Sequence, residues 1–167
     1  ELAQRLELSL EIRKFAVAQL QLPDNASYSR FVETGRDAVT WNVVAAAEFS
    51  LAPRQWCFLV SGCVPYRGYF KLKNAEDFAA RLSATGFDTA VSPVIAYSTL
   101  GWFDDPLLDT MFQYSDEQLA AVIFHELAHQ ELYVRGDTTF SESYASFVEE
   151  TGLRLWLESS GREQLLS

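Results

Sequence analysis

The sequence predicts a single α+β domain, and two patterns in it lead to that class. Both ends of the chain space their apolar residues as helices do, whereas the part from 39 to 91 is rich in β-branched and aromatic residues separated by turn residues. Helix, strands and helices therefore follow one another along the chain, as in an α+β fold. A length of 167 residues suits one domain, and 49% hydrophobic residues suffice for a sizeable core.

Each element follows from apolar spacing and from its flanking turn residues. The first 20 residues predict a helix closed by Pro23. A capping-box spacing at Ser115 and Gln118 predicts the start of another helix, with Gly136 as its stop. Gly152 weakens the middle of the last expected helix. In chain order after the first helix, we expect strands at 40–44, 55–60, 66–72 and 94–100 and helices at 74–85, 115–136 and about 141–158.

The charge of the chain bears on its partners. Acidic residues outnumber basic ones 23 to 13, for a net charge of −10, and the cations are scattered singly. Such a surface repels a phosphate backbone, so nucleic acid is not an expected partner. No apolar run approaches the length of a membrane span. The chain starts at Glu1 without a recognisable leader, and we expect it to be a trimmed part of a longer protein.

The two cysteines, Cys57 and Cys63, leave two alternatives open. They are too few for a disulfide scaffold or a cysteine zinc site. On one straight strand their Cα atoms would lie roughly 20 Å apart, too far for a bridge. A turn at Ser61 and Gly62 would bring the sulfurs together, and a bridge would imply an oxidising compartment. Two buried free thiols are the other alternative.

The strongest chemical signal is the segment His125-Glu126-Leu127-Ala128-His129, which contains the only two histidines of the chain. Residues four apart share a helix face, so both imidazoles point the same way at the separation of metal ligands. Glu126 is then placed to act as a general base. Chance produces this pattern in such a chain on the order of once in a thousand. Two satisfied histidines on an ordinary amphipathic helix are the alternative, but burying them with a glutamate is costly without a metal.

The third metal ligand has to be a carboxylate, because the chain has no third histidine and no nearby cysteine. Glu131 points elsewhere on the same helix. Glu142 and Glu149 are seven residues apart and share a face, so one could bind metal while the other supports a histidine. Spacing alone does not choose among the downstream candidates, which are Glu131, Asp137, Glu142, Glu149 and Glu150.

These residues carry a family resemblance. The stretch 124–130 followed by 140–149 resembles the gluzincins, which join a zinc-binding HExxH helix to a glutamate helix. The second stretch is similar to the Asn-Glu-Gly-Phe-Ala-Ser-Tyr segment of the large zinc aminopeptidases, with Ser141 in place of the asparagine. The whole chain resembles a bacterial family of predicted zinc aminopeptidases. The similar stretches are 22–28, 40–46, 56–70, 96–109 and 124–152.

The resemblance implies a zincin-like metallopeptidase domain over 1–167, with a small mixed or antiparallel sheet, an active-site helix and a following glutamate helix. It implies one Zn²⁺ per chain, with His125, His129 and Glu142 as ligands and Glu126 as general base. It also implies a location in the bacterial cell envelope, in the periplasm, with membrane attachment through a lipid anchor ahead of Glu1. No transmembrane segment is expected within this chain.

Further residues are expected to bind substrate or to support the metal centre. Zinc peptidases of this kind bind substrate along a sheet edge, which implies such a role for Ala96, Tyr97, Ser98 and Thr99; an ordinary internal strand is the alternative. We expect Tyr133 to stabilise the oxyanion, with Tyr144 and Arg135 as alternatives. Glu149 and Asp137 are expected to support the metal ligands from behind. The acid that would hold a substrate α-ammonium stays open among Asp104, Asp105 and Glu149.

The sequence thus predicts a zinc-dependent peptidase, with aminopeptidase specificity implied by the resemblance and a peptide as its substrate. A metal-stabilised envelope protein that binds peptides or partners without cleaving them is the alternative. A hydrolase that acts on another acyl bond is a third possibility, because the ligand set does not encode the substrate.

Overall fold

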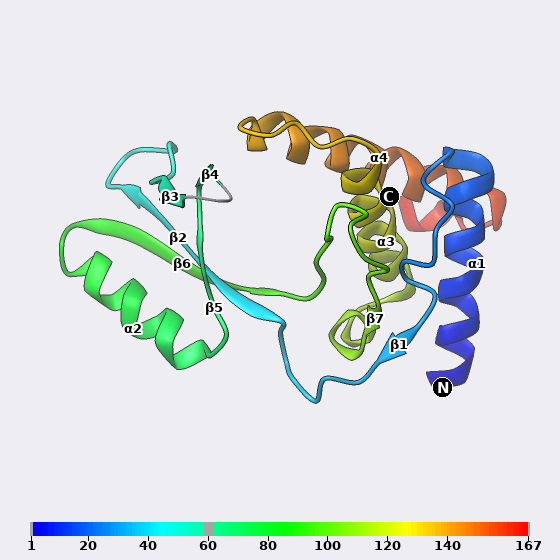
Figure 1. Cartoon of the computed structure of the whole chain (residues 1–167), viewed down its shortest axis with the longest axis horizontal. Helices are drawn as coiled ribbons and strands as arrows, with labels where there is room; N and C mark the ends of the chain where they lie inside the picture. The colour runs from blue at the N-terminus through cyan, green and yellow to red at the C-terminus, as the bar shows by residue number, and fades with distance from the viewer. Residues whose placement is uncertain (1, 59–61, 167) are drawn as a thin grey trace. The chain divides into compact units, whose positions relative to one another are not determined.

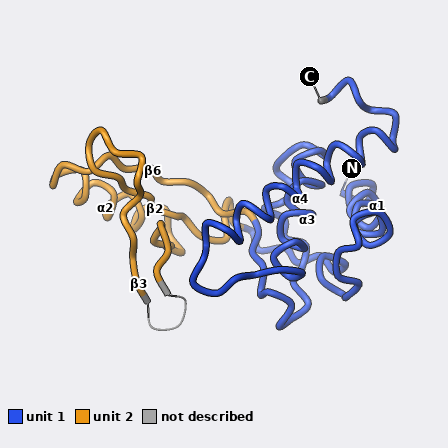
Figure 2. The backbone as a smooth tube through the Cα atoms, turned by 90° about the horizontal axis from the view of Figure 1, so that it is seen from above, with its two compact units in different colours: residues 1–35, 96–167 blue, residues 36–95 orange. Residues whose placement is uncertain are grey.

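The computed structural model describes residues 2–58 and 62–166 and confirms the α+β class (Figure 1). The described residues form α-helices, short 3-10 helices and three small sheets. They divide into two compact units, one built from residues 1–35 and 96–167 and the other from residues 36–95 (Figure 2). Compactness in space does not by itself define a functional domain, so one peptidase domain over 1–167 stays a prediction.

The first unit is built on the helices α1 (Leu2–Leu20), α3 (Asp116–Glu131) and α4 (Thr138–Ser159). Its other elements are a parallel pair of strands, β1 (Phe31–Val32) and β7 (Leu107–Leu108), and the 3-10 helices η1 (Asp109–Gln113) and η2 (Glu163–Leu166). The helices meet over apolar side chains that are almost fully withdrawn from solvent, which makes α3 the central helix of this unit. They include Ile12, Ala16, Leu119, Ile123, Phe124, Leu127, Ala145 and Leu157.

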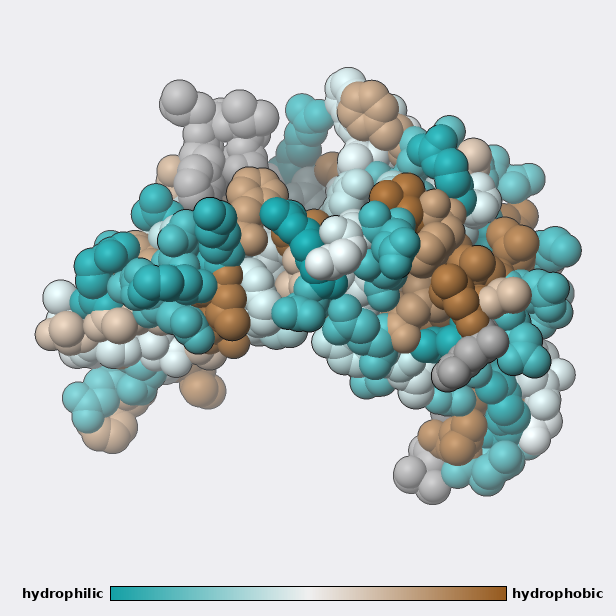
Figure 3. Space-filling model, turned by 90° about the horizontal axis from the view of Figure 1, so that it is seen from below, coloured by the Kyte–Doolittle hydropathy of each residue, from teal (hydrophilic) through white to brown (hydrophobic). Residues whose placement is uncertain are grey.

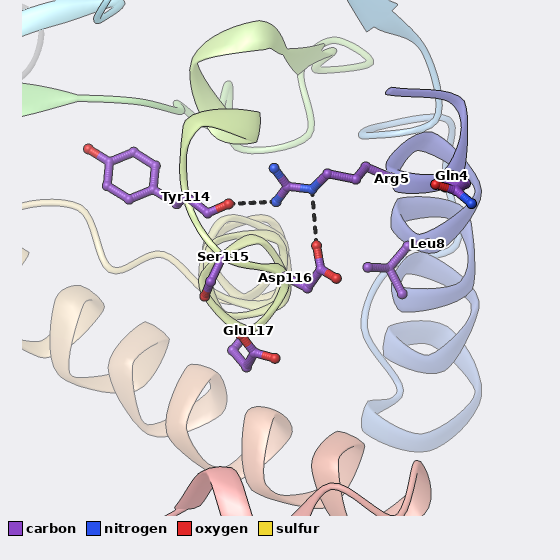
Figure 4. Close-up of a pocket in the computed structure, with 7 residues that line it drawn as sticks. All are labelled: Gln4, Arg5, Leu8, Tyr114, Ser115, Asp116 and Glu117. Atoms are coloured by element: carbon purple, nitrogen blue, oxygen red, sulfur yellow. Dashed lines mark hydrogen bonds and ion pairs between the residues drawn. The ribbon is translucent and has the colours of Figure 1, made fainter. Parts of the chain in front are cut away.

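The start of α3 agrees with the predicted capping box. The Ser115 hydroxyl accepts from the Gln118 amide, and the Gln118 side chain accepts in return from the Ser115 amide. Arg5 of α1 adds a tertiary contact, because its guanidinium bonds Asp116 Oδ1 at 3.0 Å and the Tyr114 carbonyl at 2.7 Å (Figure 4). Arg5, Ser115 and Asp116 are among the residues that line a pocket of about 550 Å³, which holds none of the predicted site residues. Local capping and this arginine together fix where the helix begins.

The predicted junction between the last two helices is wrong at both ends. The first of them stops at Glu131 rather than running to Gly136, because Leu132 takes an extended backbone conformation. Gly136, with φ of +85°, lies in the connecting turn instead. The next helix begins three residues before the expected Ser141, because the Asp137 carboxylate caps it by accepting from the Phe140 amide at 2.9 Å.

Gly152 is placed in α4 by packing rather than by chance. A Cβ atom at this position would lie 2.6 Å from Leu20 Cδ1 and 3.0 Å from Phe124 Cδ2. A side chain here would force Leu20 and Phe124 to shift, so glycine favours this close approach of α4 to α1 and α3. Gly152 thus weakens α4 locally, but it also allows α4 to pack against α3, which carries the two histidines.

The second unit is an antiparallel sheet covered by α2 (Leu72–Ser83). The strand order is β5 (Arg67–Tyr69), β2 (Thr40–Ala47) and β6 (Phe87–Val94). Alternate residues of β2 point toward the helix, as the two-residue period of a strand requires. The resulting core contains Val43, Ala45, Ala75, Ala79 and Leu82.

The strand predicted at 94–100 is wrong. The observed strand β6 ends at Val94, which pairs with Thr40, the first residue of β2. Past that point β2 offers no further partner, so residues 95–99 leave the ladder and form a loop. Ala96, Tyr97, Ser98 and Thr99 therefore lie in this loop and not on a paired strand.

The cysteines are joined in a disulfide. Cys57 lies in β3 (Trp56–Phe58) and pairs directly across the hairpin with Cys63 in β4 (Gly62–Val64). The structure thus has the bridge rather than the free thiols. Ser61 of the predicted turn, and the end of the strand predicted at 55–60, lie outside the described residues, whereas Gly62 begins β4.

No helix within the described residues is both long and apolar enough to cross a bilayer. Hydrophilic and hydrophobic residues are interspersed on the surface shown in Figure 3. The apolar residues that reach solvent include Trp102 and Phe103, each 73% exposed.

Candidate metal centre

The two histidines lie on one face of α3, as their spacing predicts. Their Nε2 atoms are 3.2 Å apart, and both approach Glu142 Oε2, at 3.4 Å from His125 and 3.7 Å from His129. One donor atom from each of the three residues falls within a span of 4.8 Å. His125, His129 and Glu142 therefore form a group that could hold a metal ion.

Glu142 reaches this group because the first turn of α4 is anchored to the turn before it. The fully buried Ser141 hydroxyl accepts from the Val134 amide at 3.0 Å and lies 3.0 Å from the Asp137 carbonyl, to which it donates. These bonds tie residues 134–137 to the start of the helix, so the side chain that follows Ser141 is held at the histidine pair. The serine at this position thus supports Glu142 through the backbone.

Glu149 lies behind the first histidine. Its Oε2 is 2.8 Å from His125 Nδ1. Two helical turns separate it from Glu142, so the two carboxylates on one face of α4 meet opposite nitrogens of the same ring. A carboxylate at Nδ1 favours the tautomer with the proton on that nitrogen, which leaves the Nε2 lone pair free to bind a metal.

The charges of the site perturb its pKa values. Burial opposes protonation of His125, but the carboxylates of Glu142, Glu126 and Glu149 outweigh it and raise the pKa of the imidazole to about 9. Hydrogen bonds from His125 and His129 lower the pKa of Glu142 to about 2, against the smaller effect of burial. Without a metal, His125 therefore behaves as an imidazolium beside the ionised carboxylate of Glu142.

Glu126 has a different environment from the other acids. Burial raises the pKa of its carboxyl group, and the two histidines offset only part of that rise. A carboxylate whose pKa is moved upward toward neutrality is better suited to exchange protons near neutral pH than an exposed one.

Comparison with protein-family models gives the family. The model that matches describes a family called "Putative aminopeptidase", and the match covers residues 1–166. The chain belongs to this family. Searches among curated proteins and among solved structures found no match. The family's description makes this chain a candidate peptidase. The residues of its candidate site are identified by their geometry.

In this member of the aminopeptidase family, the remaining predicted residues have the following contacts. Tyr133 stacks edge-on near His129, with ring centroids 6.0 Å apart, and is 36% exposed. The Asp137 side chain caps α4. The Tyr97 carbonyl accepts a hydrogen bond from the Tyr28 hydroxyl at 2.9 Å.

Two of the three acids left open for a substrate ammonium are already engaged. Asp105 is 2% exposed and accepts from the Thr99 amide at 2.8 Å and from Gln130 Nε2 at 3.0 Å. Glu149 is bonded to His125. Asp104 is exposed, and its role as an ammonium partner stays a prediction.

Sequence reasoning missed polar residues next to the site, above all the buried Tyr28 and the partly buried Gln130. Tyr28 is fully buried, and burial followed by the charges of Glu126 and Asp105 raises the pKa of its hydroxyl. One signal was available, because Gln130 comes four residues after Glu126 and so shares its helix face. Tyr28 carried no local signal, since its partners lie far along the chain.

Proposed function

We propose that this protein is a zinc-dependent aminopeptidase with a zincin-like fold, in which Glu126 is the general base. The observation that carries the proposal is the convergence of two imidazole nitrogens and one carboxylate oxygen where the C-terminal half of α3 faces the start of α4, with Glu149 behind His125. Membership in the aminopeptidase family supports peptide bonds as the substrate.

The donors fit a zinc ion. Two imidazole nitrogens 3.2 Å apart, both turned toward one carboxylate, repel each other unless a proton or a metal cation lies among them. Two imidazoles and a carboxylate are the donor set of many catalytic zinc sites, and they leave one coordination position open. His125, His129 and Glu142 would hold the ion, one per chain.

A bound zinc ion supplies a Lewis acid that polarises the scissile carbonyl and favours deprotonation of water. The chain's own residues supply the proton transfers. The Glu126 carboxylate takes a proton from the attacking water and then delivers it to the nitrogen of the leaving amine. Its raised pKa suits both steps, because the same group has to accept and release a proton. The Tyr133 hydroxyl donates a hydrogen bond to the developing oxyanion.

The surroundings of the protein are part of the proposal. A disulfide persists in oxidising compartments, so the Cys57–Cys63 bridge supports a location in the periplasm of a bacterial cell envelope. A lipid anchor ahead of Glu1 would attach the protein to the membrane.

The first experiment is the zinc content of the purified protein and of three variants. We expect about one zinc per chain in the wild type, its loss in Glu142→Ala, and its retention in Glu149→Ala with an affinity weaker by about 10- to 100-fold. Glu150→Ala is the matched control, because Glu150 is exposed on the same helix. A wild-type protein that takes up no stoichiometric zinc, even when zinc is added, would refute the proposal.

The second experiment tests catalysis. Glu126→Gln should keep its zinc and lose hydrolysis of leucine 4-nitroanilide and of a pentapeptide with a free amino terminus, since the amide cannot accept the proton. Hydrolysis that survives this change would exclude Glu126 as the base. A zinc-loaded wild type that cleaves neither substrate but binds the pentapeptide would instead indicate a metal-stabilised binding protein.

A further inference from the structure

The loop 97–105 lies against the face of α3 that carries Glu126. Asp105 of this loop accepts from Gln130 Nε2 at 3.0 Å, and a Cβ atom built on Gly101 would lie 3.9 Å from Gln130 Cβ. Because Gln130 follows Glu126 by four residues, the two share one side of the helix. The backbone of the loop therefore runs beside the face that bears the proposed general base.

Ser27 and Tyr28 form a second segment, which is buried and binds this loop through hydrogen bonds. The Tyr28 hydroxyl donates to the Tyr97 carbonyl at 2.9 Å, and the Tyr28 amide donates to the Asp105 carbonyl at 2.6 Å. The Ser27 hydroxyl accepts from the Asp105 amide at 3.1 Å and from Gln130 Nε2 at 3.2 Å.

The buried polar groups of this network are costly to bury unless they are bonded. Ser27 and Tyr28 are fully buried, and Asp105 is 2% exposed. Their hydrogen bonds join two loops and a helix, and none of the three is used in the proposed proton transfers.

Two residues of this region have an unusual backbone conformation. Tyr28 and Leu100 both have φ of +58°, in the left-handed region that L side chains rarely adopt. Such conformations persist where the surroundings over-determine them, and they cluster at functional sites. One of the two residues lies in the loop, and the other lies in the segment that holds it.

We infer that Tyr28 and Asp105 are positioning residues that fix the backbone of the loop segment Tyr97–Thr99 as a docking site for the peptide substrate beside Glu126. This inference rests on the proposed peptidase function. An extended peptide binds to exposed backbone through main-chain hydrogen bonds. A backbone that is already ordered loses less entropy on binding, so the network stabilises the bound state of long substrates more than of short ones.

Tyr28→Phe tests the inference, because it removes one hydroxyl and keeps the buried ring. The KM of a free pentapeptide should rise about fivefold, as expected from the loss of one positioning hydrogen bond, while kcat stays the same. The KM of leucine 4-nitroanilide should stay within about twofold, since this substrate is too short to extend along the loop. Tyr114→Phe, the same chemical change at a tyrosine outside this network, should alter neither constant.

Zinc content and amide exchange accompany the kinetics of each variant. Faster exchange across 97–105 at full zinc occupancy would show that the loop has loosened without loss of the metal. If the loop loosens and the pentapeptide KM stays unchanged, or if KM rises equally for both substrates, the positioning role is wrong and the proposed function stands. A zinc-loaded wild type that hydrolyses neither substrate contradicts the proposed function itself, and this inference falls with it.

Asp105→Asn is the second variant, and it approaches the network from the other side. It keeps the shape of the side chain but removes the negative charge that accepts from the Thr99 amide and from Gln130. The same selective rise in pentapeptide KM is expected, again about fivefold. Asp104→Asn is its control, because the neighbouring Asp104 is exposed. Equal effects of the two substitutions would exclude a specific role for Asp105.

Discussion

In the metal-free protein, the His125 imidazole should titrate with a pKa of about 9, against an ordinary value of 6.5. This difference corresponds to about 3 kcal/mol of preference for the imidazolium, supplied by Glu142, Glu126 and Glu149. At pH 8, about 90% of His125 would be protonated, compared with about 3% of a histidine with the ordinary pKa. Measurements at this one pH therefore separate the two cases.

The assay is an NMR titration of the imidazole C–H signals, and it is simple here because the chain has only two histidines. A His129→Gln variant assigns the signals. Glu149→Gln should lower the pKa of His125, since it removes the charge at Nδ1, whereas Glu150→Gln should leave it in place. Two imidazoles that both titrate near 6.5 would refute the placement of these carboxylates around His125.

The same shifts predict how the stability of the metal-free protein depends on pH. The pKa of His125 is raised by folding, so its contribution is complete below about 6.5 and is lost as the pH rises through about 9. The pKa of Glu142 is lowered, so its contribution is present above about 4.5 and is lost as the pH falls through about 2. These two groups therefore stabilise the fold most between about pH 4.5 and 6.5, which urea unfolding across the pH range would test.

Two further predictions concern the scaffold. Gly152→Ala should destabilise the protein by up to about 2 kcal/mol, because overpacking against Leu20 and Phe124 costs about 1–3 kcal/mol and the better helix propensity of alanine returns about 1 kcal/mol; a higher urea midpoint in this variant would contradict the packing. Replacing Cys57 and Cys63 together by serine should cost about 2 kcal/mol, from the entropy of a short closed loop. Zinc content should stay at the wild-type level, since none of the three donors lies in that hairpin. A loss of zinc in this variant would contradict the independence of the metal centre from the disulfide.

Local signals in the sequence predicted the fold well, and partners distant in the chain decided the rest. The start of α3 was predictable because Ser115 and Gln118 are three residues apart. The position of β6 was not, because the strand predicted at 94–100 lies at Phe87–Val94, where it pairs with β2 up to Thr40. The early start of α4 was not predicted, because two β-branched threonines with weak helix propensity follow Asp137. In the structure, the cap that the Asp137 side chain provides outweighs that weak propensity.

The candidate site likewise has a part that local sequence signals predict and a part that depends on distant contacts. A helical repeat of four residues is enough to predict that His125 and His129 converge. The separate contacts of Glu142 and Glu149 depend on how α4 crosses α3, which in turn depends on the glycine at 152 and on the buried Ser141. No pattern within one segment contains that information, so the sequence alone left the carboxylates as alternatives.

Protons and metal compete for the same donors, and this competition gives a last prediction. Metal binding requires His125 to release its proton, because a protonated imidazole has no lone pair to offer. Since the pKa of His125 is about 9, the apparent zinc affinity should rise about tenfold per pH unit between pH 7 and 8, where the ring is still mostly protonated. Competition with a chelator of known pH dependence measures this slope. An affinity that does not change over this interval would mean that His125 is already neutral in the metal-free protein, and that Glu142 and Glu149 do not hold a proton on it.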